Sequence, residues 1–236
     1  MKKLLFAAVA LAFATPASAV TVDPYEQLSG PTPSVGNFVF GTVNSTGVLT
    51  PFNALQRPCD GFSFNTCARN LGQDVPVVAA PTQPINAGNF IIPGDQLFLH
   101  PSNEARVGLS FVAALAGAYK FVGEFSVLSP TASGIGTGAL VLNGVTLLPT
   151  EFLASGSRFF DFTQSLGAGD TVTFFVDPAG SFISDSTGLS LQVTNIAPVV
   201  GAVPEPSTWL MMILGFGLVG GTLRSRRRAA TGLAAA

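Results

Sequence analysis

Residues 107–111 read Val-Gly-Leu-Ser-Phe, and residues 171–176 read Thr-Val-Thr-Phe-Phe-Val. In both runs an apolar side chain stands at every second position, which predicts a β-strand with one buried face. Thr173, between Val172 and Phe174, is therefore expected on the outer face. The same alternation recurs in the later runs that contain Tyr119, Phe121, Phe125 and Val127, then Phe160 and Phe162, then Leu189, Leu191 and Val193.

Turn signals separate these runs. Asn143-Gly144 lies between two short apolar pieces and favours a two-residue hairpin, because both residues accept a positive φ. The segments 167–170 and 177–180 combine Gly with Asp or Pro. Roughly eight short strands without helical periodicity predict an all-β protein, an antiparallel jelly-roll β-sandwich over residues 94–196.

Three segments of this region resemble parts of known domains. The segments 141–145, 169–174 and 185–189 resemble jelly-roll domains of the carbohydrate-binding-module type found in secreted bacterial proteins. The resemblance implies polysaccharide as a partner. The sequence assigns no aromatic side chains as a platform on which a sugar ring could stack. Tyr25 and Tyr119 are the only tyrosines, and most phenylalanines stand at core-facing positions.

Residues 20–93 are rich in Pro, Gly, Asn and Thr, and we interpret them as a loop-rich segment with short strands. They hold both cysteines, Cys59 and Cys67. Two cysteines are too few for a structural zinc site, whereas an oxidising compartment favours a disulfide. We therefore predict that they are bonded to each other.

Charge is distributed unevenly along the chain. Residues 20–203 contain five basic and twelve acidic side chains, a net charge of −7. Such a domain repels phosphate backbones, so nucleic acid is excluded as a partner. The remaining basic residues lie near the two ends of the chain.

The N-terminal segment has the three parts of a signal peptide. Lys2 and Lys3 precede an apolar run at 4–14, and Ala17-Ser18-Ala19 forms a small-residue cleavage site. Eleven apolar residues are too few to cross about 30 Å of hydrocarbon. Residues 1–19 are therefore predicted to be a signal peptide that is cleaved after Ala19.

The C-terminal segment predicts a membrane helix. Residues 207–223 form an uncharged run of seventeen residues. This length is at the short limit for a membrane span. Trp209 marks the outer interface, and the basic tail at 224–236 is expected on the cytoplasmic side because positive charge favours that side. The basic side chains of this tail are Arg224, Arg226, Arg227 and Arg228.

The linker at 197–206 ends in Pro204-Glu205-Pro206. This tripeptide, followed by Trp209, an apolar stretch and the arginine cluster, resembles the PEP-CTERM sorting signal of Gram-negative bacteria. The resemblance implies recognition by exosortase, a membrane protease-transpeptidase, and a link to exopolysaccharide. The matching part covers about 25 residues and excludes the eight residues after Arg228.

Residues that could support catalysis are few. His100 is the only histidine; it precedes a proline, has no acid beside it, and is interpreted as an isolated exposed side chain. Glycoside hydrolysis needs two carboxylates about 5–10 Å apart. Four acids are scattered over different strands, so we expect no enzyme, no catalytic residue and no cofactor. These acids are Glu104, Glu124, Glu151 and Asp161.

Asp177 and Asp185 permit two interpretations. With the carbonyl groups of residues 178–184 they could hold calcium, which binds carboxylate and carbonyl oxygens. Alternatively they are turn residues that accept hydrogen bonds from their own backbone. The spacing matches no strict calcium loop, and no metal site is assigned.

Three classes of function follow. The leading one is an exported, non-enzymatic cell-surface or matrix protein, held at the inner membrane before processing and associated with exopolysaccharide or biofilm. The second is a specific carbohydrate-binding module, and the third is a secreted hydrolase.

Overall fold

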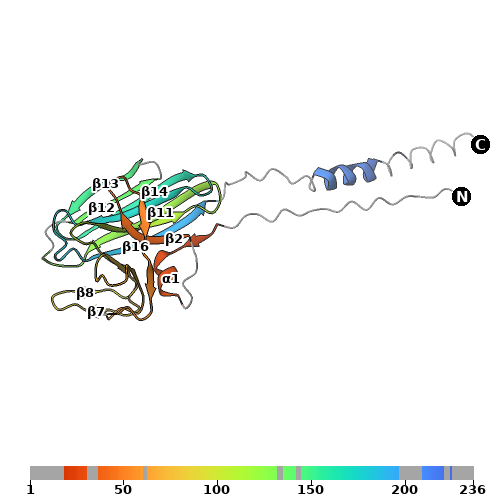
Figure 1. Ribbon diagram of the computed structural model, residues 1–236. Coiled ribbons are helices and arrows are strands. Elements are labelled where there is room, and N and C mark those ends of the chain that lie inside the picture. Colours follow the sequence, from red (N-terminus) through yellow and green to blue (C-terminus); the bar gives the residue numbers. More distant parts are fainter. Residues whose placement is uncertain are drawn as a thin grey trace, which may run out of the picture. The chain divides into compact units, whose positions relative to one another are not determined.

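A computed structural model describes residues 19–30, 37–60, 63–131, 135–141, 145–196, 209–220 and 224. The described residues between 18 and 197 belong to one compact unit, and the described residues 209–220 and 224 belong to a second unit. The first unit is a sandwich of two antiparallel β-sheets (Figure 1). This arrangement confirms the predicted all-β sandwich.

Among its described residues, the sandwich unit has one short helix and strands that lengthen toward the C-terminal half. The helix α1 begins after Asp23, whose side chain accepts a hydrogen bond from Tyr25 N, and it has Pro24 at its first position. The elements are β1 (Thr21–Val22), α1 (Pro24–Ser29), β2 (Phe38–Val43), β3 (Leu49–Pro51), β4 (Ala54–Gln56), β5 (Cys67–Arg69), β6 (Val77–Ala79), β7 (Ile85–Asn86), β8 (Ile91–Ile92), β9 (Leu97–His100), β10 (Arg106–Val112), β11 (Gly117–Val127), β12 (Ile135–Val141), β13 (Thr146–Leu153), β14 (Ser157–Leu166), β15 (Thr171–Asp177) and β16 (Thr187–Ile196).

The eight strands from β9 to β16 pair in a nested order. The first pairs with the last, β9 with β16, and the pairing then continues inward as β10 with β15, β11 with β14 and β12 with β13. Successive strands alternate between the two sheets, except that β12 and β13 lie in the same sheet. This is the strand order of a jelly roll. The turn between β12 and β13, predicted at Asn143-Gly144, lies outside the described residues.

Residues 20–93 extend both sheets. In the six-stranded sheet, β2 pairs with β10, and β3 pairs with β2. In the eight-stranded sheet, β6 pairs with β9, β5 pairs with β6, and β4 pairs with β5. The eight-stranded sheet therefore has the order β14-β11-β16-β9-β6-β5-β4, with β1 also paired to β16, and the six-stranded sheet has the order β13-β12-β15-β10-β2-β3. Strands β7 and β8 form a separate two-stranded sheet. The added strands cover β9 and β10, whose backbone groups would otherwise form exposed edges that can pair with other chains.

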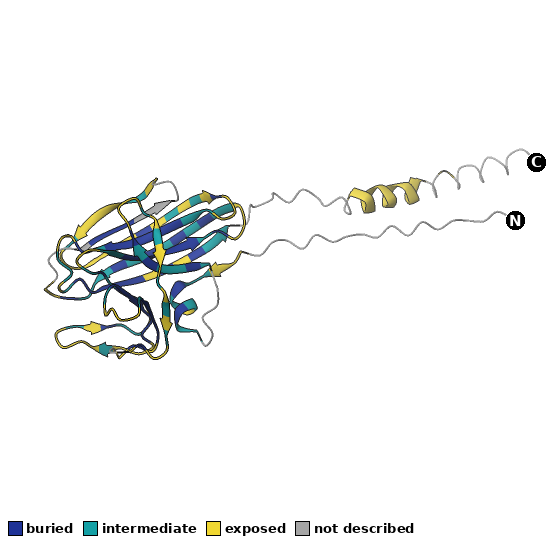
Figure 2. Ribbon diagram, viewed as in Figure 1, coloured by how far each residue is buried: buried dark blue, intermediate teal, exposed yellow. Residues whose placement is uncertain are grey.

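The predicted inner faces form the core between the sheets. Val107, Leu109 and Phe111 of β10 are buried, and Phe121 and Phe125 of β11 are fully buried. Figure 2 shows the buried positions along the inner strands, in contrast to the exposed residues of β13. Rings from four strands meet there: the Phe111 and Phe121 centroids are 5.6 Å apart, and those of Phe160 and Phe174 are 5.4 Å apart.

The expected exposure of Thr173 is wrong. Its side chain is buried, and its Oγ1 lies 2.7 Å from Ser110 Oγ on the paired strand β10. Residues of the hairpin between β2 and β3, including Val48 and Leu49, line a hollow together with Ser110 and Thr173. The alternation identified the inner face correctly but could not show that a distant hairpin covers the outer one.

A second apolar cluster lies under the loops of residues 59–98, and it contains the disulfide. Cys59 and Cys67 are bonded, with Cα atoms 5.5 Å apart, which confirms the predicted pair. The cluster consists of Cys59, Phe64, Cys67, Val77, Ala79, Ile92 and Phe98.

Of the predicted span at 207–223, the structure describes residues 209–220, which are helical. None of the helices in the described part of the chain is long and apolar enough to cross a membrane. Of the predicted signal peptide at residues 1–19, only Ala19 is described, so Ala17 and the rest lie outside the described residues.

Candidate functional site: a polar cleft at one end of the sandwich

Three strands of the six-stranded sheet meet at one end of the sandwich. Arg106, at the start of β10, pairs with Val43 at the end of β2, and Val107 pairs with Val176 near the end of β15. Because the strands are antiparallel, the loops that follow β2 and β15 and the loop that precedes β10 gather at this end.

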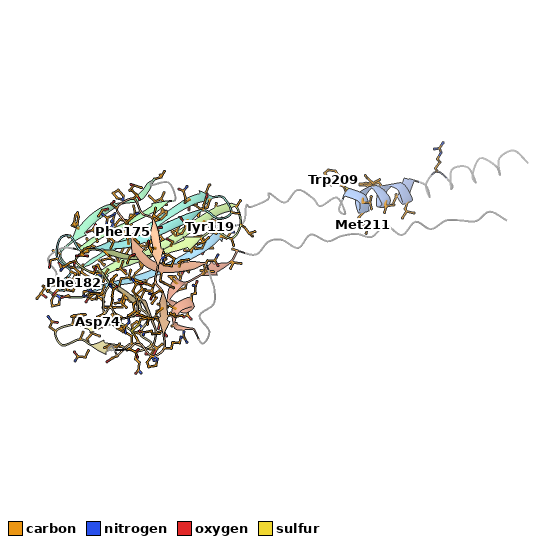
Figure 3. The ribbon with its side chains drawn as sticks, viewed as in Figure 1. Asp74, Tyr119, Phe175, Phe182, Trp209 and Met211 are labelled. Atoms are coloured by element: carbon orange, nitrogen blue, oxygen red, sulfur yellow. A yellow bond between two sulfur atoms is a disulfide. The ribbon has the colours of Figure 1, made fainter. Side chains whose placement is uncertain are left out.

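These loops, together with residues 70–76 between β5 and β6, line two adjoining open hollows of about 440 and 460 Å³. The hollows share Asn103, Glu104 and Ala105, so we treat them as one polar cleft. Figure 3 labels Phe182 and Asp74 at this end of the molecule and Tyr119 toward the other. The polar side chains that line the cleft are Thr42, Asn44, Ser45, Asn70, Gln73, Ser102, Asn103, Glu104, Arg106 and Asp177.

An ion pair fixes the charged wall of the cleft. Arg106 Nε donates to Asp177 Oδ2, and the Arg106 guanidinium lies over the Phe175 ring, 4.9 Å from its centroid. Asp177 Oδ1 accepts a hydrogen bond from Ala179 N at 2.9 Å. Asp177 is therefore one of the predicted turn-forming aspartates, and its charge is offset by Arg106.

Hydrogen bonds from side chains to the backbone also hold the loops that carry this ion pair. Asn103 Oδ1 accepts a hydrogen bond from Phe182 N at 3.3 Å, which joins the loop before β10 to the loop after β15. Ser102 Oγ accepts from Ala105 N at 3.1 Å. Glu104 is exposed beside them. The cleft thus presents amide, carboxylate and guanidinium groups, which are the donors and acceptors that sugar hydroxyls need.

His100 is not the exposed side chain that we expected. It is half-buried, with its ring centroid 6.1 Å from that of Phe98 and 5.9 Å from that of Phe182, and its Nδ1 lies 2.9 Å from Pro101 O. Burial lowers the pKa of His100 below its ordinary value. The histidine ring therefore packs between the rings of Phe98 and Phe182.

The four scattered acids lie in different surroundings. Glu104 lies in the cleft, while Glu151 forms an ion pair with Arg158 at 3.0 Å and Asp161 forms one with Lys120 at 3.1 Å. Glu124 lies on β11, whose register places it opposite Phe159 and Ser190. Within the described ranges no group of three or more His, Cys, Asp or Glu side chains could hold a metal ion.

Asp185 differs from Asp177 in a way that the sequence did not reveal. Its side chain is buried, and neither carboxylate oxygen has a hydrogen-bond partner. Burial, with a smaller contribution from the charge of Asp177, raises the pKa of Asp185 to about 7. The turn-forming interpretation is therefore wrong for the side chain of Asp185.

The residues of the predicted sorting signal are only partly described. Trp209 is half-exposed at the start of the helical segment, and Arg224 is exposed. Pro204, Glu205, Pro206 and the arginines at 226–228 lie outside the described residues.

Solved structures similar to this chain include carbohydrate-binding modules. A β-(1,4)-mannanase of Podospora anserina with a family 35 module is 17% identical, over 50% of this chain and 24% of its own, with a TM-score of 0.28. A family 51 module from Clostridium perfringens, in complex with methyl-galactose, is 8% identical over 57% of this chain and 95% of its own, with a TM-score of 0.35. A family 35 module from Clostridium thermocellum is 15% identical over 75% and 98%, with a TM-score of 0.27.

A comparison with curated proteins finds no match. The C-terminal region, in contrast, matches a family model. Residues 202–228 match the PEP-CTERM protein-sorting motif, so this chain carries that sorting motif after its β-sandwich.

Proposed function

We propose that this chain is an exported, non-enzymatic protein of the cell surface or extracellular matrix, sorted through its C-terminal signal and associated with exopolysaccharide. This proposal rests on the match of residues 202–228 to the PEP-CTERM motif. The signal peptide at 1–19 directs export, and the apolar segment at 207–223 holds the precursor in the inner membrane. An exosortase-type protease then recognises Pro204-Glu205-Pro206 and releases the sandwich outward.

The placement of the acids and of the histidine supports a non-enzymatic role. Glu151 and Asp161 are in separate ion pairs, and His100 packs between two phenylalanine rings with its Nδ1 beside a carbonyl group. A general base must be within hydrogen-bond reach of the proton that it removes. These contacts hold the groups in structural roles instead.

Sorting is tested by intact mass and fractionation in the native host. We expect a mature protein that lacks residues 1–19 and the tail after the Pro-Glu-Pro region, found at the surface or in the medium. In a strain without exosortase the same protein is expected in the inner membrane with its tail intact. Equal mass and equal distribution in both strains would refute the proposal.

The polar cleft favours a second function, direct binding of a neutral sugar. Its walls combine amide groups with Glu104, and the charge of Asp177 is offset by Arg106, so the site offers little attraction for an anionic sugar. The test is retention of the mature protein on a panel of insoluble polysaccharides. Replacing Glu104 with Ala is expected to weaken retention. Gln164→Ala, on the distant strand β14, is the control and should leave retention unchanged.

A further inference from the structure

One edge of the sandwich is long and open, and it belongs to β14. This strand ends the eight-stranded sheet and pairs with β11 in one unbroken register from Ser157 to Leu166. Within the described residues no strand pairs with its other side. Ser165 O accepts a hydrogen bond from the exposed Gln164 amide at 3.0 Å, a local contact that a neighbouring strand would replace. The backbone groups on this side are therefore available to another chain.

The other three edges of the two main sheets are blunted. At the far ends, β3 and β4 have three residues each, and β3 contains Pro51. The remaining edge, β13, contains Pro149, exposes Glu151 and shifts its register with β12 twice. Short strands, prolines, charges and bulges keep sheet edges from pairing. In contrast, β14 has ten residues without Pro or Gly and without a register shift.

The charged side chains of β14 are bound within their own molecule. Asp161 forms an ion pair with Lys120 on the neighbouring strand β11 at 3.1 Å. Arg158 reaches β12 and β13, where its Nη1 donates to Thr137 O at 2.7 Å and its Nε pairs with Glu151 at 3.0 Å. Neither charge is left unpaired at the edge, where it would oppose a neighbouring strand.

Strand β14 is complementary to a second copy of itself in one register. In an antiparallel pair, opposite residues face the same side of the sheet, so two β14 strands can shift only in steps of two residues. Two such registers pair nine of the ten residues. One places Asp161 opposite the same residue of the second copy, which is unfavourable because the charges are alike. The other places Asp161 opposite Thr163, and the exposed Phe159 opposite Ser165.

We propose that β14 of one copy pairs antiparallel with β14 of a second copy, in the register that places Asp161 opposite Thr163. The two eight-stranded sheets then become continuous, and the contact is two-fold symmetric because the same edge serves both copies. A single strand pair buries less than the roughly 1,600 Å² of a standard stable interface, so the dimer forms at micromolar or higher concentration. This inference rests on neither the proposed sorting nor sugar binding.

Sedimentation velocity measures the association of the exported protein, purified from its native host, from about 10 to about 500 µM. Detergent is present if the apolar segment at 207–223 is still attached. The mass is expected to double over this range. Phe159→Lys places a lysine on the open edge, opposite Glu124 of its own β11, and is expected to raise the dissociation constant at least about tenfold.

Phe152→Lys is the matched control. Phe152 is 61% exposed and Phe159 is 65% exposed, but Phe152 lies on the blunted edge β13. The control should therefore associate like the unaltered protein. Because both variants carry the same added charge, a difference between them reports the edge and not the net charge.

Cysteine cross-linking tests the register. Cys59 and Cys67 are bonded to each other, so an introduced cysteine supplies the free thiol. Equal amounts of the Asp161→Cys and Thr163→Cys proteins are mixed and oxidised with diamide. The mixture is expected to give a disulfide-linked dimer. Each variant alone should give several-fold less, because identical positions then lie diagonally, about 7–8 Å apart, which is too far for a disulfide.

Three results would overturn the proposal. The first is a mass that stays monomeric over the whole concentration range. The second is equal association of Phe159→Lys and Phe152→Lys, and the third is an equal cross-linking yield from the mixture and from the separate variants. If Phe159→Lys does not fold, the cross-linking comparison decides.

Discussion

Thr173 is the residue at which strand alternation gives the wrong environment. Because its hydroxyl lies 2.7 Å from that of Ser110 and both side chains are buried, removing one leaves the other without a partner. We predict that Thr173→Ala lowers the free energy of unfolding by about 1–3 kcal/mol. Thr163→Ala, at an exposed position of β14, is the control and should cost less than about 0.5 kcal/mol.

A double-mutant cycle in urea distinguishes the hydrogen bond from packing. Ser110→Ala combined with Thr173→Ala is expected to cost less than the sum of the two single changes, since no unpaired hydroxyl then remains. Strict additivity would mean that the two hydroxyls do not interact.

His100 gives a prediction about pH. Burial lowers its pKa in the folded protein below the ordinary value of 6.5, so the unfolded chain binds a proton more readily. The stability that neutral His100 contributes is therefore present above about pH 6.5 and is lost as the pH falls below that value. Between about pH 7.5 and pH 5 the melting temperature of the unaltered protein is expected to fall toward that of His100→Gln. A constant difference between the two would show that His100 does not titrate differently on folding.

At the scale of elements, the disulfide closes a short loop over the second apolar cluster. Both sulfur atoms are buried, and Cys67 lies on β5, which pairs with β6 of the eight-stranded sheet. Replacing both cysteines with Ala is expected to lower the free energy of unfolding by about 2–3 kcal/mol, mainly because the unfolded chain regains the freedom of that loop. Alkylation of the exported protein under denaturing, non-reducing conditions checks the bond directly. Two reactive thiols would contradict it.

The long strands could be predicted from sequence, and the short ones could not. In β10, β11, β15 and β16 an apolar inner face repeats with period two over seven or more residues, which is a strong local signal. Strands β4, β5 and β6 have three residues each, and they are placed by pairing in series, β4 with β5, β5 with β6, and β6 with β9. Three residues are too few for a period-two alternation to be recognised in the sequence.

The same limit applies to the candidate site. The cleft is assembled from loops that are separated by more than a hundred residues, from Asn44 to Asp177. No local motif marks it, and Asn103 and Phe182 are brought together only by the fold. Asp185 was singled out in the sequence because of its residue type, but its burial without a partner depends on how the segment 128–131 packs beside it.

For the whole molecule, the sandwich and the sorting segment have separable physical roles. The sandwich has a net acidic charge, whereas four arginines follow the apolar segment at 207–223. Positive charge beside a span biases that side toward the cytoplasm. Replacing the four arginines with Gln is therefore expected to disturb membrane orientation while leaving Pro204-Glu205-Pro206 available for recognition. Protease accessibility of the tail in membrane vesicles measures this orientation.

Glu205→Ala tests recognition without altering the anchor. The apolar segment and the arginines are unchanged, so insertion and orientation should match those of the unaltered protein. The prolines at 204 and 206 still restrict the backbone, so the extended shape of the segment is also kept. What is lost is one carboxylate at the site where the protease binds. We expect the variant to accumulate in the inner membrane of the native host, heavier than the mature protein by the uncleaved tail.

Ser207→Ala, which changes a neighbouring residue, is the matched control and should mature normally. If the Glu205 variant is cleaved and distributed like the control, residues 202–228 act in this protein only as an anchor.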